Sequence, residues 1–111
     1  MRDDRLRLED VLEAIAKIRQ YTDGQRDAFF GDEMLQVWVL HHIQMMGEAL
    51  APLSPELREA NRSWARGVIA MRNVLVHQYF GIDLALVWQV VEHDLDILEA
   101  RVQTLLDTLI D

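Results

Sequence analysis

Residues 32–50, from Asp32 to Leu50, read DEMLQVWVLHHIQMMGEAL. A long helix is predicted here, and its large apolar residues are too numerous for a single stripe: Met34, Leu35, Val37, Trp38, Val39, Leu40, Ile43, Met45 and Met46. A helix that is apolar on most sides lies at the centre of a bundle or buries a second face against another chain. The pattern leaves both readings open, a central helix without a partner and a homodimer.

The segment before this helix predicts an amphipathic helix, followed by a short helical turn that closes one end of the core. Over residues 5–21 the apolar side chains recur at spacings of three and four, which marks one helical face: Leu8, Val11, Leu12, Ile15 and Ile18. Thr22-Asp23-Gly24 interrupts the pattern. Residues 25–31 are expected to form a short helical turn in which Phe29 and Phe30 close the end of the core.

The segment after it is broken by Pro52 and Pro55, where a short helix is expected to begin. A further helix is predicted from about residue 64 to Phe80-Gly81. Asp83 is a suitable cap for a last helix, whose apolar rhythm runs through Leu84, Val87, Trp88, Val91, Leu95, Leu98, Val102, Leu105 and Leu109. No strand pattern competes. The expected fold is all-α, an up-and-down four-helix bundle with one or two extra short helices, in a single domain over residues 1–111.

Composition restricts the classes of protein to consider. A chain of 111 residues that is half apolar can bury one real core. It has no cysteine, which excludes disulfides, thiolate metal sites and cysteine nucleophiles, and which fits a reducing compartment. No apolar run reaches the length of a membrane span, and the charged start Met1-Arg2-Asp3-Asp4-Arg5 is unlike a signal peptide. We expect a cytoplasmic protein.

Charge is unevenly distributed along the chain. The net charge of −8 disfavours nucleic-acid binding, because affinity for phosphates is largely electrostatic. Residues 57–82 nevertheless carry four arginines against the single acid Glu59, whereas residues 83–111 carry seven acids and one arginine. On a helix Arg58, Arg62 and Arg66 form one basic stripe leading toward Arg72. We expect Arg62 and Arg66 to bind a polyanionic substrate; the alternative is an ordinary solvated helix face.

The basic region ends in the most reactive group of side chains, in residues 72–79, which read RNVLVHQY. Arg72 is a permanent cation that forks onto phosphate oxygens, His77 titrates near neutral pH, and Tyr79 offers a phenol that a partner could modify. On an ideal helix Arg72 and His77 point about 140° apart. Either the helix ends or distorts within the motif, or a dimer brings two motifs together across its axis.

This stretch resembles the signature of HepT-like toxins, small all-helical ribonucleases of the HEPN superfamily. Their motif reads R-x-x-x-x-H-x-Y, and Arg72, His77 and Tyr79 fit it. The resemblance covers nearly the whole chain and includes the stretch IQMMGEA at residues 43–49. The sequence departs from the family pattern at two positions. It has Ala70 where a glycine is common, and it lacks the proline often found before the tryptophan at Trp64. The resemblance implies a homodimer with a composite site.

Ribonuclease chemistry fits these side chains because RNA carries its own nucleophile, the 2′-hydroxyl. Cleavage then needs no metal, cofactor or covalent intermediate, only a group that moves protons and a group that stabilises the phosphorane-like transition state. We assign the first role to His77 and the second to Arg72. Asn73 is a candidate helper that hydrogen-bonds the substrate, although a local backbone hydrogen bond is an equal alternative. The sequence does not indicate which RNA is cut.

The resemblance also implies a regulator. In HepT-like toxins the tyrosine two residues after the histidine is modified with AMP by a cognate MntA-like nucleotidyltransferase antitoxin, so Tyr79 is the expected AMPylation site. Added phosphate would repel and obstruct an approaching RNA phosphate.

Three rival interpretations remain. A metal-binding bundle could use His41, His42, Glu48, His77 or His93, but the sequence lacks the Glu-x-x-His pairs of di-iron bundles, and His93 is expected to lie exposed on an acidic face. No metal site is therefore predicted. A catalytically silent HEPN-type binding subunit of a nucleotidyltransferase would share the bundle and the partner without needing both Arg72 and His77. A purely structural interaction protein would need neither.

Overall fold

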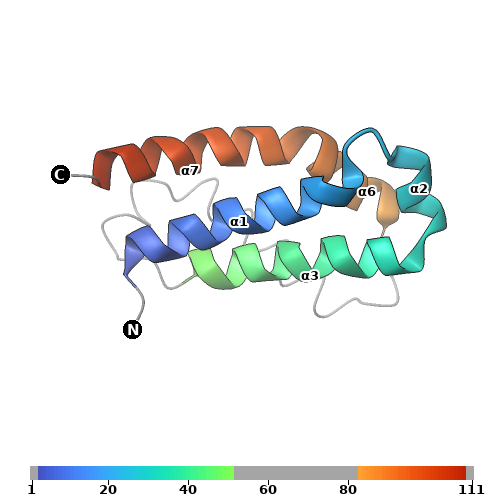
Figure 1. The fold of residues 1–111 in the computed structure, drawn as a ribbon, viewed down its shortest axis with the longest axis horizontal. Coiled ribbons are helices and arrows are strands. Elements are labelled where there is room, and N and C mark those ends of the chain that lie inside the picture. The colour runs from blue at the N-terminus through green and yellow to red at the C-terminus, as the bar shows by residue number, and fades with distance from the viewer. Residues whose placement is uncertain (1–2, 52–82, 110–111) are drawn as a thin grey trace.

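The computed structural model describes residues 3–51 and 83–109, and all regular structure in these two stretches is helical. Three long helices run side by side, with α1 (Asp4–Thr22) between α3 (Glu33–Leu50) and α7 (Leu95–Leu109) (Figure 1). The short helices α2 (Arg26–Gly31) and α6 (Leu84–Gln89) lie together at one end. The predicted all-α class is confirmed. The helices predicted after Pro55 and from about residue 64, among them the fourth long helix of the bundle, lie outside the described residues.

Helix α1 spans Asp4–Thr22, close to the predicted 5–21. Asp3 caps its start, because the carboxylate accepts a hydrogen bond from the backbone N–H of Leu6 at 2.9 Å. The predicted stripe lies inward, with Leu8, Val11, Ile15 and Ile18 fully buried. The chain then turns at Gly24, whose φ of 66° lies in the left-handed region that favours glycine.

Helix α2 spans Arg26–Gly31 and closes one end of the core as predicted. Phe29 is fully buried, and its ring meets those of Phe30 and Trp88, each with centroids 5.3 Å away. Phe30 packs against the core from a partly buried position and carries the Arg26 guanidinium 4.9 Å above its ring. The short helix is thus held by aromatic packing.

Helix α3 spans Glu33–Leu50 and starts at Asp32, whose carboxylate accepts from the N–H of Leu35. One face is buried against the rest of the bundle: Val39, His42, Ile43, Met46, Gly47, Ala49 and Leu50. Met34, Val37 and Met45 lie on the opposite side and are exposed, Met34 by 81%. These three residues and His41 between them are called the α3 outer face. The predicted excess of apolar surface is therefore a second face of the helix.

The C-terminal segment is interrupted where the sequence predicted one continuous α-helix. Asp83 caps α6 (Leu84–Gln89) as expected by accepting from the N–H of Ala85 at 2.9 Å. A π-helical turn, η2 (Val90–Asp94), then precedes α7 (Leu95–Leu109). The N–H of Leu95 donates to the carbonyl of Val90, five residues back.

Packing accounts for this wide turn. Val90 is 9% exposed and Leu95 is fully buried, yet two residues five apart point about 140° away from each other on an ideal α-helix. Widening the turn brings both side chains toward the core. The predicted rhythm is also wrong at its end, because Leu106 is buried and Leu109 is exposed.

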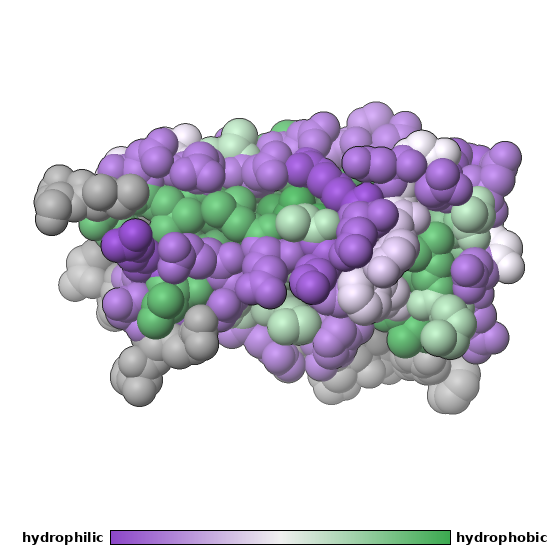
Figure 2. Space-filling model, in the orientation of Figure 1, coloured by the Kyte–Doolittle hydropathy of each residue, from purple (hydrophilic) through white to green (hydrophobic). Residues whose placement is uncertain are grey.

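Charge and apolar contact together join α1 to α7. Arg19 forms an ion pair with Glu99 at 2.9 Å and another with Asp96. The hydrogen bond to Glu99 raises the pKa of Arg19, so its charge is retained at all ordinary pH values. Figure 2 shows an apolar strip between these two helices, bordered by polar side chains. Among the helices of the described part, none is both long and apolar enough to cross a membrane.

Candidate functional site

The predicted reactive residues belong to the part of the chain that the structure leaves undescribed. Arg72, Asn73, His77 and Tyr79 lie between the end of α3 and the cap of α6, within residues 52–82, together with the proposed substrate ligands Arg62 and Arg66. Their mutual geometry stays a prediction. The first described residue after them is Asp83, four positions beyond Tyr79 in the sequence.

The contacts of His42 and His93 do not resemble those of metal ligands. His42 is buried, its Nδ1 lies 2.8 Å from the carbonyl oxygen of Trp38, and its ring centroid lies 4.4 Å from that of Trp38. His93 is exposed and its Nε2 lies 3.6 Å from Glu92, as expected for an acidic face. Within residues 3–51 and 83–109, no three His, Cys, Asp or Glu residues are grouped closely enough to hold a metal ion. The described histidines thus give no support to the metal-binding rival.

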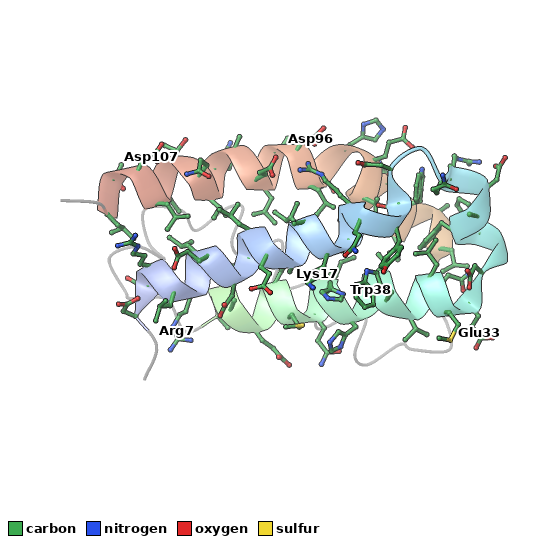
Figure 3. All side chains as sticks on the ribbon, viewed as in Figure 1. Arg7, Lys17, Glu33, Trp38, Asp96 and Asp107 are labelled. Carbon is green, nitrogen blue, oxygen red and sulfur yellow. The ribbon has the colours of Figure 1, made fainter. Side chains whose placement is uncertain are left out.

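Two grooves follow the junction of α1 and α3. The first, of about 610 Å³, is lined from α1 by Arg7, Asp10, Glu13, Ala14 and Lys17, and from α3 by His41, His42, Met45, Glu48 and Ala49. It mixes both signs of charge, so it has no strong preference for an anion. Figure 3 shows Lys17, one of these lining residues, near Trp38 of α3.

The second groove is called the aromatic groove and has a volume of about 650 Å³. It lies where α1, α2 and α3 meet and is lined by Gln20, Tyr21, Asp23, Gln25, Ala28, Asp32, Met34, Leu35 and Trp38. The rings of Tyr21 and Trp38 meet edge to face with centroids 5.4 Å apart. The indole N–H of Trp38 donates to the carbonyl oxygen of Lys17 at 2.8 Å.

Sequence reasoning did not find this groove. Tyr21 and Trp38 are separated by the turn at Gly24 and the whole of α2, and each is an ordinary edge residue of its own helix. Their meeting depends on how α1 and α3 pack, which no local pattern encodes. The signal that was available, an excess of apolar residues in α3, indicated only that a second surface exists.

The all-helical architecture and the motif of residues 72–79 together define the class, a helical domain of the HEPN type. The family model named "Ribonuclease HepT-like" matches residues 11–105, which include the whole motif. The chain belongs to this family.

Several relatives are similar over most of the chain. A Methanocaldococcus jannaschii protein named "Gamma-glutamylcyclotransferase and putative RNase" is 36% identical over 97% of this chain, which spans only 50% of that relative's length. A second protein of that organism, named "Putative RNase", is 30% identical over 92% of this chain and 95% of its own length. "Probable ribonuclease HepT" of Thermococcus cleftensis is 30% identical over 88% of this chain and 91% of its own. No solved structure gives a significant match.

Proposed function

We propose that this protein is the toxin component of a toxin-antitoxin system, a metal-independent endoribonuclease of the cytoplasm that works as a homodimer. The observation that carries the proposal is the family match over residues 11–105, which contains Arg72, His77 and Tyr79 in the order and spacing of the motif. The names of the relatives, which refer to ribonucleases, agree with it.

The proposed reaction is an internal transesterification. The 2′-oxygen of RNA bonds to the adjacent phosphorus while the bond to the 5′-oxygen breaks, leaving a 2′,3′-cyclic phosphate and a free 5′-hydroxyl. His77 transfers protons, from the attacking hydroxyl or to the departing oxygen, and a second His77 in a dimer supplies the other transfer. Arg72 stabilises the extra negative charge on the phosphorane-like transition state. Asn73 orients the substrate, and Arg62 and Arg66 bind neighbouring phosphates.

The α3 outer face supports the dimer. Met34, Val37, His41 and Met45 recur at spacings of three and four, so they lie along one side of the helix, facing away from its buried side. Exposed apolar side chains in a row favour association with another surface. In a dimer with twofold symmetry, the same surface of each subunit meets at the axis, so this face would contact its copy in the second subunit. We assign the dimer contact to this face.

The proposed regulator is an MntA-like nucleotidyltransferase antitoxin that transfers AMP to Tyr79. The phenol oxygen bonds to the α-phosphorus of ATP and pyrophosphate leaves. The modification adds bulk and negative charge two residues from His77, where an RNA phosphate must approach, and both effects oppose substrate binding.

The test is RNA cleavage by the purified full-length protein in EDTA, after mass spectrometry has shown it to be free of AMP. We expect cleavage by wild type and a loss of at least about 100-fold in His77→Ala and Arg72→Ala, the scale of one proton-transfer or charge-stabilising group. His93→Ala is the matched control, since His93 is exposed on η2, and it should retain full activity.

Circular dichroism and sedimentation must show that all variants are equally folded and equally associated. If AMP-free wild type cleaves no RNA, the catalytically silent binding subunit becomes the better assignment. Equal activity of wild type and both motif variants would contradict the roles given to Arg72 and His77.

A further inference from the structure

We propose that the aromatic groove is a docking site for a basic segment of a protein partner, with an arginine or lysine side chain laid against Tyr21 and Trp38. The described residues that line the groove all fall between Gln20 and Trp38, far in sequence from the motif of residues 72–79. Such a docking site can exist whether or not the protein cleaves RNA, and the two ideas can fail separately.

The aromatic pair is held in place before any partner arrives. Trp38 is fixed from α3 to α1 by its indole hydrogen bond to the carbonyl of Lys17, and its ring is flanked by that of His42. Tyr21 meets Trp38 edge on while remaining 52% exposed. A preorganised ring pair loses little conformational entropy on binding. Such rings attract the guanidinium or ammonium group of a side chain.

The groove also offers apolar contact next to the rings. Leu35 and Ala28 line the hollow beside the two rings. Figure 2 shows pale, weakly polar side chains beside apolar ones toward the α2 end of this face. The aliphatic stem of an arginine or lysine, or a neighbouring leucine, fits such a surface.

The charge of the groove selects the partner. Of its described lining residues, only Asp23 and Asp32 are charged, and both are acidic. Asp32 uses one oxygen to cap α3. Asp23 closes α1 through its backbone N–H and is exposed, and its carboxylate is also attracted by Arg19, whose charge is already shared with Glu99 and Asp96. Two carboxylates repel an RNA phosphate and attract a cation. A basic protein segment is therefore favoured over a nucleic acid.

The test is titration of the ¹⁵N-labelled full-length protein with the peptide acetyl-Arg-Leu-Arg-amide, followed by amide and indole N–H shifts. The indole signal of Trp38 is assigned with Trp38→Phe. We expect shift changes confined to residues around Tyr21, Asp23 and Trp38. Asp23→Asn and Tyr21→Leu should each weaken binding about two- to fivefold, the scale of one exposed ion pair or one cation–π contact.

The matched control is Asp94→Asn, which removes one exposed carboxylate from η2 and so changes the net charge equally. It should leave binding unchanged. The proposal is overturned if Asp94→Asn weakens binding as much as Asp23→Asn, if acetyl-Glu-Leu-Glu-amide shifts the same signals, or if a hexauridylate shifts them more strongly. It is also overturned if no signal moves at about 10 mM peptide, above the roughly millimolar Kd expected of so small a probe.

Discussion

Gly24 lies in the turn that follows α1, and its backbone conformation explains why a glycine stands there. A Cβ atom at Gly24 or at Gly31 would meet no atom within 4 Å, so neither position is limited by space. Of these two glycines, Gly24 alone has a positive φ, 66°. We therefore expect Gly24→Ala to lower the free energy of unfolding by about 1–2 kcal/mol, the cost of a left-handed backbone for a residue with a Cβ.

Gly31→Ala is the matched control, because Gly31 ends α2 with an ordinary backbone. We expect it to change stability by no more than about 0.5 kcal/mol, with a slight gain from helix propensity. Urea unfolding of both variants decides the matter. Equal losses in the two would show that backbone strain at Gly24 is not the cause.

Tyr79 and Tyr21 are the two tyrosines of the chain, which makes the proposed modification easy to assign. We expect Tyr79→Phe to keep ribonuclease activity and to lose AMP transfer, because only the phenol oxygen is removed. Tyr21→Phe is the control, because Tyr21 is exposed and could also be reached by the nucleotidyltransferase. This variant should still receive AMP, on Tyr79. Intact-mass measurement after incubation with the nucleotidyltransferase and ATP gives the answer; AMP on Tyr79→Phe would refute the assignment.

At the scale of elements, the π-helical turn η2 holds one residue more than a regular α-helical path needs. Deleting the exposed His93 should let η2 relax to an α-helix while Trp88, Leu95 and Leu98 keep their inward direction. Glu92, which accepts the indole N–H of Trp88 at 2.5 Å, keeps its spacing from that tryptophan. We expect a loss of about 1–2 kcal/mol or less.

Deletion of the exposed Arg101 in α7 is the control. It rotates the rest of the helix by about 100° and turns the buried Val102 and Leu106 away from the core. The expected loss is about 3–6 kcal/mol, from two buried aliphatic side chains. Thermal and urea unfolding compare the two deletions. If deletion of His93 costs as much as deletion of Arg101, η2 is not a dispensable insertion.

At the scale of the whole molecule, the α3 outer face determines the proposed dimer. We expect the double variant Val37→Glu and Met45→Glu to weaken self-association by at least about 100-fold, because each charge would be buried without a partner at the contact. Sedimentation velocity of the full-length protein measures the effect. Ribonuclease activity should fall with the dimer if the site is composite.

Leu86→Glu provides the comparison, since Leu86 is also exposed, by 61%, but belongs to a different helix, α6. It should leave association unchanged. A monomeric wild type would contradict the proposed dimer. A double variant that remains dimeric would show that the dimer contact uses another surface. Arg19 is unaffected in all these variants, and its ion pairs with Glu99 and Asp96 should keep α1 and α7 joined.

The order of residues was enough to predict the all-α class, the bounds of α1 and α3 to within one residue, the buried position of Phe29 and the cap at Asp83. Spacing and capping are local, acting between residues three or four apart, so they can be read from the order of side chains. The assignment of Arg72, His77 and Tyr79 also comes from the sequence and stays a prediction, as these residues lie outside the described ones.

Helix packing accounts for four features that the sequence did not predict: the wide turn at η2, the pairing of Tyr21 with Trp38, the ion pairs of Arg19 and the choice of the exposed face of α3. Each depends on the distance and rotation between helices that are remote in the sequence. The same amphipathic pattern can pack in several ways, and side-chain packing across the helices selects one of them. That selection leaves an aromatic groove open beside two carboxylates.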